Sequence, residues 1–110
     1  MPIAVAQKVE SLAHDLGSRR RVAEALGVNP AQVTRWARGG GIEADNAERL
    51  DLLELVTSYL GRLYAPTLFE DWLLGLNPHL GDRRPIDAIR ARDLDAVLGA
   101  LRAEQGESFA

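Results

Sequence analysis

The sequence predicts an all-α protein, on three observations. Apolar residues recur at spacings of three and four along most of the 110 residues, as on the buried face of an amphipathic helix. Glycines and Pro-containing pairs separate these stretches at short intervals, where helices end and begin. The alternating, β-branched runs that half-buried strands need are missing.

Two short helices are predicted at the N-terminus. The first covers about residues 3–16 and ends at Gly17, a residue type that closes helices. The second covers residues 19–26, with Ser18 as its N-cap and Gly27 as its end.

A third helix follows at once. Asn29 is a suitable N-cap, and Pro30 occupies the first helical position, where no N–H is needed. Gln32, at the third helical position, completes a capping box with Asn29. We expect this helix to run to Arg38 and to end at the three glycines of residues 39–41.

A long helix is predicted from Asp45 or Asn46 to Leu63, and its apolar arc is too wide for one core. One stripe consists of Leu53, Val56, Leu60 and Leu63. The adjoining stripe consists of Leu52, Leu55 and Tyr59, which we interpret as a dimer interface. A two-fold dimer would place two DNA-reading helices about one DNA turn apart. The alternative is that the C-terminal part of the same chain covers both stripes.

Three more helices complete the prediction. Pro66 begins a helix over residues 67–76, which Asn77-Pro78 stops; after a charged loop, Pro85 opens a short helix and Asp93 caps a final one. The expected core of this part consists of Trp72, Leu73, Leu76, Leu80, Ile86, Ile89, Leu94, Val97, Leu98 and Leu101.

Size and composition are those of a single globular domain or two small lobes, with 46% hydrophobic and 26% charged residues. Apolar runs are shorter than the roughly 20 residues of a membrane span, and the first residues lack a secretory pattern. We therefore expect a cytoplasmic protein with no membrane contact. The chain has no cysteine and its two histidines lie far apart in sequence, so we expect no metal and no cofactor.

Charge is distributed unevenly along the chain. Residues 1–41 contain six basic and three acidic residues, a net charge of 6 − 3 = +3. Residues 42–110 contain seven basic and thirteen acidic residues, a net charge of 7 − 13 = −6, which leaves the formal −3 of the whole chain. This polarity predicts two surfaces with different partners.

The stretch from Arg19 to Trp36 resembles a helix-turn-helix of the Xre/Cro type. Ala23 is small enough to let the second helix approach the third, and Gly27 permits the turn. The side chains expected to pin the third helix to the core are Val28, Val33 and Trp36. The resemblance implies DNA binding; the alternative is a helical hairpin with a solvated basic face.

The outer face of the third helix is the expected DNA-reading surface, because its side chains are short or hydrogen-bonding types suited to base edges and phosphates. Arg35 is the leading candidate for reading a base. Arg19 and Arg20, at the start of the second helix, would contact the DNA backbone, aided by that helix's dipole. The candidate DNA-binding residues are Arg19, Arg20, Gln32, Thr34, Arg35 and Arg38.

The C-terminal part supplies a second resemblance. Trp72-Leu73, the segment from Asn77 to Ile89 (NPHLGDRRPIDAI), and Val97, Leu101 and Gly106 look like the toxin-binding domain of Xre/MbcA/ParS-type antitoxins. One position departs from the pattern: Asp82 stands where relatives often have a second glycine, which puts the conformation of this loop in question.

Together, the two resemblances imply an antitoxin. Such a protein binds and masks a RES-domain toxin that depletes NAD, while its helix-turn-helix represses the shared operon. The implied organisation is a DNA-binding lobe in residues 1–41, a linking or dimerisation helix in 42–65 and a toxin-binding domain in 66–110. The expected assembly is a homodimer within a hetero-oligomer with the toxin. Candidate toxin contacts are Arg83, Arg84, Glu107, Ser108 and Phe109, the last three in a polar tail that would reach the toxin's active site or simply fray.

Catalysis is not expected. Nucleophilic or acid–base chemistry needs polar groups that converge, yet His14 lies in the first predicted helix and His79 in a loop. The rival interpretation is a stand-alone Xre-type transcriptional repressor, which the genes beside its own would distinguish from an antitoxin.

Overall fold

The computed structural model describes the backbone of residues 4–109 and the side chains of residues 4–106. Its helices confirm the all-α prediction. In chain order they are α1 (Val5–Leu16), α2 (Arg19–Leu26), α3 (Pro30–Ala37), α4 (Ala44–Leu60), η1 (Pro66–Leu68), α5 (Phe69–Leu74), η2 (Pro78–Leu80), α6 (Pro85–Arg90) and α7 (Leu94–Phe109), where η marks a 3-10 turn. Within the described residues, Asn77 and Arg83 form an isolated antiparallel β-bridge.

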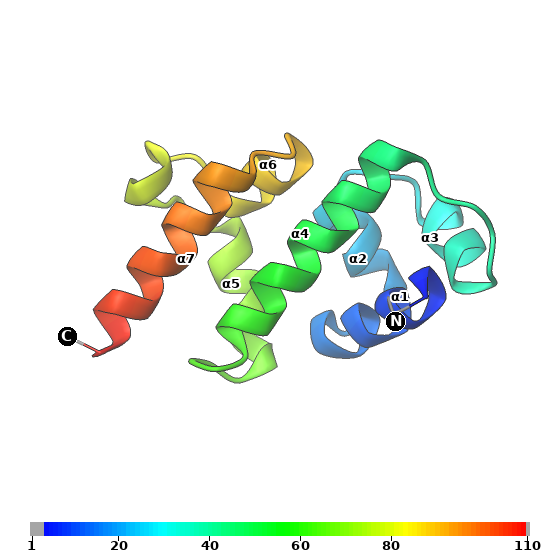
Figure 1. Cartoon of the computed structure of the whole chain (residues 1–110). Helices are drawn as coiled ribbons and strands as arrows, with labels where there is room; N and C mark the ends of the chain where they lie inside the picture. Colours follow the sequence, from blue (N-terminus) through cyan, green and yellow to red (C-terminus); the bar gives the residue numbers. More distant parts are fainter. Residues whose placement is uncertain (1–3, 110) are drawn as a thin grey trace.

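The long helix α4 lies in the middle of the molecule (Figure 1). Helices α1 and α2 pack on one side of it and α6 and α7 on the other, while α3 packs on α1 and α2, and α5 packs on α6. The molecule measures 43 × 26 × 24 Å, and Figure 1 shows α3 and the C-terminal end of α7 on opposite sides of α4. This arrangement places the candidate DNA-reading helix far from the candidate toxin-binding tail.

Three predicted N-caps are confirmed. The Ser18 hydroxyl accepts a hydrogen bond from the backbone N–H of Arg21 at 3.1 Å, at the start of α2. The Asp93 carboxylate accepts one from the N–H of Ala96 at 3.1 Å, at the start of α7. The Asn29 amide oxygen caps α3 through the N–H of Ala31, at 2.9 Å.

The predicted long helix differs from α4 at both ends. Glu43, not Asp45 or Asn46, is the N-cap, and Asn46 is a buried residue whose side chain accepts a hydrogen bond from Arg49. The helix ends at Leu60 rather than Leu63, because the backbone tightens into i→i+3 bonds such as Leu63 N–H to the carbonyl of Leu60.

The predicted helix over residues 67–76 is shorter and begins differently. Pro66–Leu68 form a 3-10 turn, and α5 then covers only Phe69–Leu74. Gly75 adopts an extended conformation, with φ −77° and ψ 147°, so the chain leaves the helix before Leu76. Leu76 consequently points away from the core and is 73% exposed.

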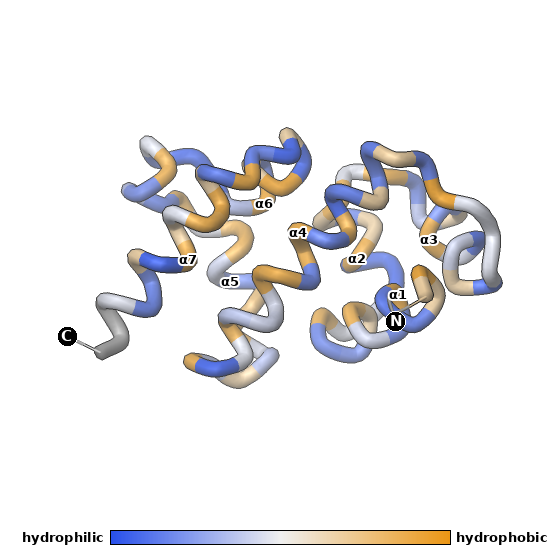
Figure 2. Tube along the Cα trace, in the orientation of Figure 1, coloured by the Kyte–Doolittle hydropathy of each residue, from blue (hydrophilic) through white to orange (hydrophobic). Residues whose placement is uncertain are grey.

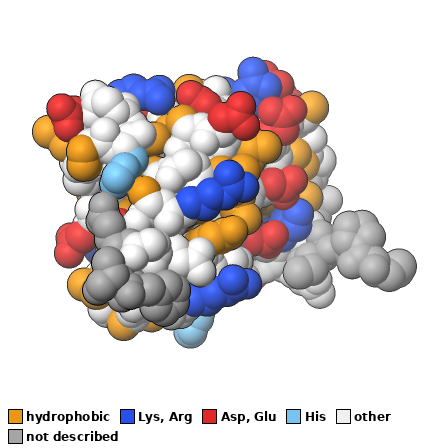
Figure 3. Space-filling view, turned by 60° about the vertical axis from the view of Figure 1, so that its left-hand side comes forward, with side chains coloured by type: hydrophobic (Ala, Val, Ile, Leu, Met, Phe, Trp, Pro, Cys, Tyr) orange, Lys and Arg blue, Asp and Glu red, His pale blue; other side chains and the backbone are white. Residues whose placement is uncertain are grey.

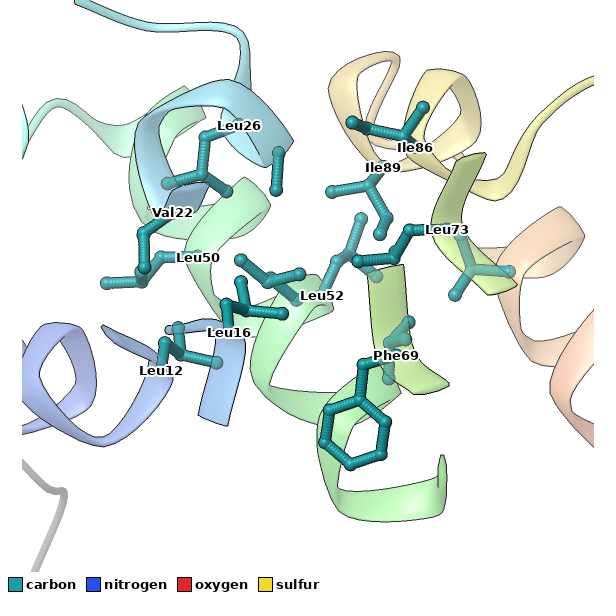
Figure 4. Close-up of a cluster of buried hydrophobic side chains, with 14 of the residues drawn as sticks. Leu12, Leu16, Val22, Leu26, Leu50, Leu52, Phe69, Leu73, Ile86 and Ile89 are labelled. Carbon is teal, nitrogen blue, oxygen red and sulfur yellow. The ribbon is translucent and has the colours of Figure 1, made fainter. Parts of the chain in front are cut away.

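One hydrophobic cluster runs through both halves of the molecule, the first formed by α1–α3 and the second by α5–α7. Figure 4 shows Leu16 and Leu26 from the first half, Leu52 from α4, and Leu73 and Ile89 from the second half around a common interior. Hydrophobic and hydrophilic positions alternate in short stretches along the helices (Figure 2), and the buried positions are almost all hydrophobic. The two halves therefore share a core.

Contacts of Arg90 also join the two halves. Arg90, on α6, donates a hydrogen bond from Nη2 to the carbonyl of Glu24 at the end of α2. Its side chain also lies against Gly27, where an added Cβ would come within 3.2 Å of Arg90 Cδ. Arg49, on α4, donates from Nε to the carbonyl of Arg90 at 2.8 Å.

The predicted C-terminal core is largely confirmed, with two errors and one omission. Besides Leu76, Leu94 is wrong: it is the first residue of α7 and 49% exposed. Phe69, which the sequence pattern did not single out, is buried beside Leu73. Trp72 and Leu98 are half-buried at the edge of the core.

Candidate functional site: the α3 face and the α7 end

Helix α3 is anchored through Val33 and Trp36, which are both buried. This anchorage turns the remaining candidate positions outward: Gln32, Arg35 and Arg38 are exposed, and Thr34 is half-buried. A shallow open hollow beside the helix is lined by Ala31, Thr34, Arg35, Arg38 and Gly40. The structure thus brings four of the six predicted DNA-binding residues onto one short helix and its C-cap.

Arg35 does not extend freely into solvent. Its Nη1 donates a hydrogen bond to the carbonyl of Gly41 at 2.9 Å, so the guanidinium lies along the glycine turn that follows α3. The remaining guanidinium N–H groups are not used by this bond. A guanidinium held at one edge keeps donors available for a base or a phosphate.

The two arginines at the start of α2 differ from each other. Arg19 forms a salt bridge with Glu10 on α1, with Nη2 and Nε at 2.6 and 3.0 Å from the same carboxylate oxygen. Its charge is therefore already compensated. Arg20 and Arg38 are exposed and form no ion pair within the described residues. Much of the uncompensated positive charge of this half thus comes from Arg20, Arg35 and Arg38.

The two apolar stripes of α4 have different surroundings. Leu53, Val56 and Leu60 are fully buried, as expected for the first stripe. Leu52, predicted to lie in a dimer interface, is only 6% exposed and belongs to the core of its own chain. Little of Leu52 is available to a partner.

Leu55 and Tyr59 remain half-buried on the outside of α4. Leu55 and Leu94 line a groove between α4 and the start of α7, whose rim includes Glu48 and Glu54. Figure 3 shows hydrophobic side chains exposed between acidic and basic ones on the side of the molecule that carries α7. The C-terminal half thus covers α4 only in part.

Both arginines proposed to contact a toxin are held by their own loop. Arg83 donates from Nε to the carbonyl of Leu80 at 3.2 Å and lies 3.5 Å from the carboxylate of Asp93. Arg84 binds Asp87 through Nε and Nη2, at 3.0 and 3.1 Å. This hydrogen-bonded pair raises the pKa of Arg84 and lowers the pKa of Asp87.

The loop that contains Asp82 has a defined conformation. Gly81 and Asp82 are both left-handed, with φ of +66° and +63°. Asn77 holds the loop from the other side: its backbone carbonyl accepts the N–H of Asp82 at 3.0 Å, and its backbone N–H donates to Arg83. Asp82 therefore adopts a backbone conformation that a glycine would take most easily.

Helix α7 includes most of the polar C-terminal tail, since its backbone stays helical to Phe109. The hydroxyl of Tyr64, which follows α4, donates to the carboxylate of Glu104 and ties α7 to the middle of the molecule. The side chains of Glu107, Ser108 and Phe109 lie outside the described residues. Their proposed contacts with a toxin therefore remain a prediction.

Two further findings concern the described residues. None of the helices in residues 4–109 combines the length and the apolar character that crossing a bilayer requires. Among the side chains of residues 4–106, no three from His, Asp or Glu gather as they would to bind a metal ion.

The fold and the two separate faces were compared with known proteins. No protein-family model and no curated protein matches the sequence. Among solved structures, the chain is similar to a chain in the crystal structure of the M. tuberculosis MbcT-MbcA toxin-antitoxin complex, with a TM-score of 0.74 and 25% sequence identity. The similarity covers 93% of this chain and 94% of that chain, so it includes both halves in their relative arrangement.

The fold is therefore similar to that of a protein from a toxin–antitoxin complex. This likeness supports an MbcA-like antitoxin and confirms the resemblance found in the sequence. The likeness supports an antitoxin function.

Proposed function

We propose that this chain is a cytoplasmic antitoxin that masks a RES-type, NAD-depleting toxin with its C-terminal half and represses its own operon through α3. The observation that carries the proposal is the fold likeness to a toxin–antitoxin complex over more than nine-tenths of both chains. The Xre/Cro-type and antitoxin-type patterns in the two halves of the sequence support the same conclusion.

Masking is proposed to be both steric and electrostatic. Residues 42–110 carry a net charge of −6, and a cleft that admits an anionic dinucleotide is expected to be basic. The C-terminal end of α7 lies on the side of α4 opposite to α3 (Figure 1), and it is the part proposed to enter such a cleft. Arg83 and Arg84, with Glu107, Ser108 and Phe109, are the proposed contacts.

The toxin experiment uses the full chain, a truncation after Arg102, and the product of the gene next to its own. We expect the full chain to stop NAD loss at an equimolar ratio and the truncated chain to protect incompletely. Complete protection by the truncated chain would refute the role of the tail while leaving antitoxin function in place. If the full chain neither binds the neighbouring gene product nor preserves NAD, the antitoxin proposal is wrong.

DNA binding is proposed for the α3 face, with Arg35 reading a base and Arg20 and Arg38 contacting phosphates. Arg35→Ala should weaken binding to a duplex from upstream of the gene by roughly 1–3 kcal/mol and leave toxin neutralisation unchanged. Arg102→Ala is the matched control, because Arg102 is an exposed arginine on α7, on the other side of α4 from α3, and its loss removes the same charge. Equal losses for the two variants would argue that only net charge matters.

Self-association is proposed through Leu55 and Tyr59, which would pair two copies so that two α3 helices reach neighbouring half-sites. Leu55→Arg should convert a dimer to a monomer in sedimentation velocity, since it places a charge at the centre of that surface. Leu76→Arg alters an exposed leucine of the C-terminal half and serves as the control. A wild-type chain that sediments as a monomer at tens of micromolar would contradict this part of the proposal.

A further inference from the structure

The turn after α3 closes the helix in an ordered way. The N–H of Gly39 donates to the carbonyl of Trp36 at 3.0 Å, and the N–H of Gly40 donates to the carbonyl of Arg35 at 2.9 Å. Gly39 is left-handed, with φ +90°. This pair of bonds is a Schellman motif, which brings the backbone of Gly40 back against the last turn of the helix.

Gly40 lies in unusually close contact with Arg35. A Cβ at Gly40 would come within 2.6 Å of Arg35 Cγ and within 2.9 Å of the Arg35 carbonyl oxygen. The second atom belongs to the backbone, and the first lies near the base of the side chain, so neither can swing away as a flexible end could. A side chain at position 40 would force the stem of Arg35 out of its present rotamer.

Gly41, the next residue, has no such steric constraint. A Cβ at Gly41 would meet no atom within 4 Å, and Gly41 has no positive φ that would favour glycine. Its carbonyl oxygen is the group that accepts the Arg35 Nη1 hydrogen bond at 2.9 Å, and any residue would supply that oxygen. The space for the Arg35 side chain thus requires a glycine at position 40. The carbonyl oxygen that accepts the Arg35 hydrogen bond would be present with any residue at position 41.

We propose that Gly40 is a positioning residue for DNA recognition: its missing side chain leaves room for the Arg35 stem, so that the Gly41 carbonyl can hold the guanidinium in one orientation before DNA arrives. The inference rests on the proposed DNA binding by α3. A long arginine side chain loses rotamer freedom when it is fixed on a ligand, and a prior hydrogen bond reduces that loss. Gly40 acts through Arg35 and touches no base itself.

The test compares Gly40→Ala with Gly41→Ala, which add the same methyl group one residue apart. Binding is measured by fluorescence anisotropy with a duplex from immediately upstream of the gene, and folding is checked by thermal melting. We expect Gly40→Ala to bind about three- to tenfold more weakly, as an off-rotamer arginine would imply. Gly41→Ala should bind within about twofold of the wild type.

A double variant separates positioning from general damage to the lobe. If Gly40 acts mainly through the Arg35 side chain, then Gly40→Ala should cost clearly less affinity in an Arg35→Ala background than in the wild type, because that background lacks Cγ and keeps only the contact with the backbone carbonyl. Additive losses would overturn the proposal, because they would show that the methyl group disturbs α3 as a whole. Wild-type affinity in Gly40→Ala would also overturn it.

A second readout needs no DNA. In the free protein, ¹⁵N relaxation of the Arg35 Nε–Hε group should report an ordered side chain in the wild type and in Gly41→Ala, and a mobile one in Gly40→Ala. An unchanged Arg35 signal in Gly40→Ala would refute the positioning role even if the duplex were bound weakly. If the wild type did not bind the duplex but the expected relaxation difference were observed, the proposed DNA binding would be wrong. The role of Gly40 in positioning Arg35 would still be supported.

Discussion

The shared core makes a quantitative prediction for Ile89→Ala. Ile89 lies on α6 and is fully buried in the cluster that includes Leu26 and Leu52 (Figure 4). Removing three carbon atoms costs about 2.4 kcal/mol at about 0.8 kcal/mol per carbon. A residual cavity raises the loss to roughly 3–4 kcal/mol, within the usual range for such truncations. With a urea m-value of about 2 kcal/mol/M, the unfolding midpoint should fall by about 1.5–2 M.

The two tryptophans allow each half to be followed separately. Trp36 is on α3 and Trp72 on α5, and neither indole N–H has a hydrogen-bond partner in the described structure. Urea titrations of Trp72→Phe and Trp36→Phe therefore report the first and the second half, respectively. Each should report the same shift when Ile89→Ala is added, since one core unfolds cooperatively.

The result that would refute this reasoning is a shift confined to one reporter. If Ile89→Ala moved only the Trp72 signal, the halves would unfold independently and the continuous cluster would not be an energetic unit. Leu76→Ala is the control, because Leu76 is 73% exposed and its truncation should cost less than about 0.5 kcal/mol.

Two smaller predictions concern the loop before α6. Asp82→Gly should stabilise the protein by up to about 1 kcal/mol in urea titrations, because Asp82 holds a left-handed φ of +63° that glycine adopts without steric cost; a clear loss would show that the carboxylate has a structural role. Asp87 has a pKa lowered by its hydrogen bond to Arg84, so its contribution to stability is present above the ordinary value of 3.8 and is lost as the pH falls through the lower folded-state pKa. Melting temperatures between pH 2 and 6 should therefore fall less steeply for Asp87→Asn than for the wild type, and identical curves would contradict the assignment.

Local rules predicted several helix ends well. Ser18, Asn29 and Asp93 cap helices because their side-chain oxygens reach N–H groups within three residues, so the sequence alone contains the whole interaction. The left-handed Gly17 and Gly27 end α1 and α2 for a similarly local reason.

The errors arise from backbone conformations, packing and side-chain contacts that the sequence pattern does not specify. The periodicity of residues 67–76 suggested a single helix, but Gly75 leaves it early and sends Leu76 into solvent. Leu52 looked free on its helix because nothing in the sequence showed that the C-terminal half packs against it. The engagement of Arg19 by Glu10 and of Arg35 by Gly41 depended on rotamers that no spacing rule supplies.

The placement of the two faces has a functional consequence. The α3 face and the end of α7 lie on opposite sides of α4, in a molecule whose longest dimension is 43 Å. A ligand on one face need not displace a ligand on the other. Toxin binding and operator binding should therefore be compatible within one assembly.

The most direct test of this account is the mass of a mixture of the chain, the neighbouring gene product and an upstream duplex, measured by size-exclusion chromatography with light scattering. We predict a single species that contains both proteins and the duplex, because separate faces hold the two partners. Displacement of the duplex when the second protein is added, or a chain that elutes alone, would contradict the account.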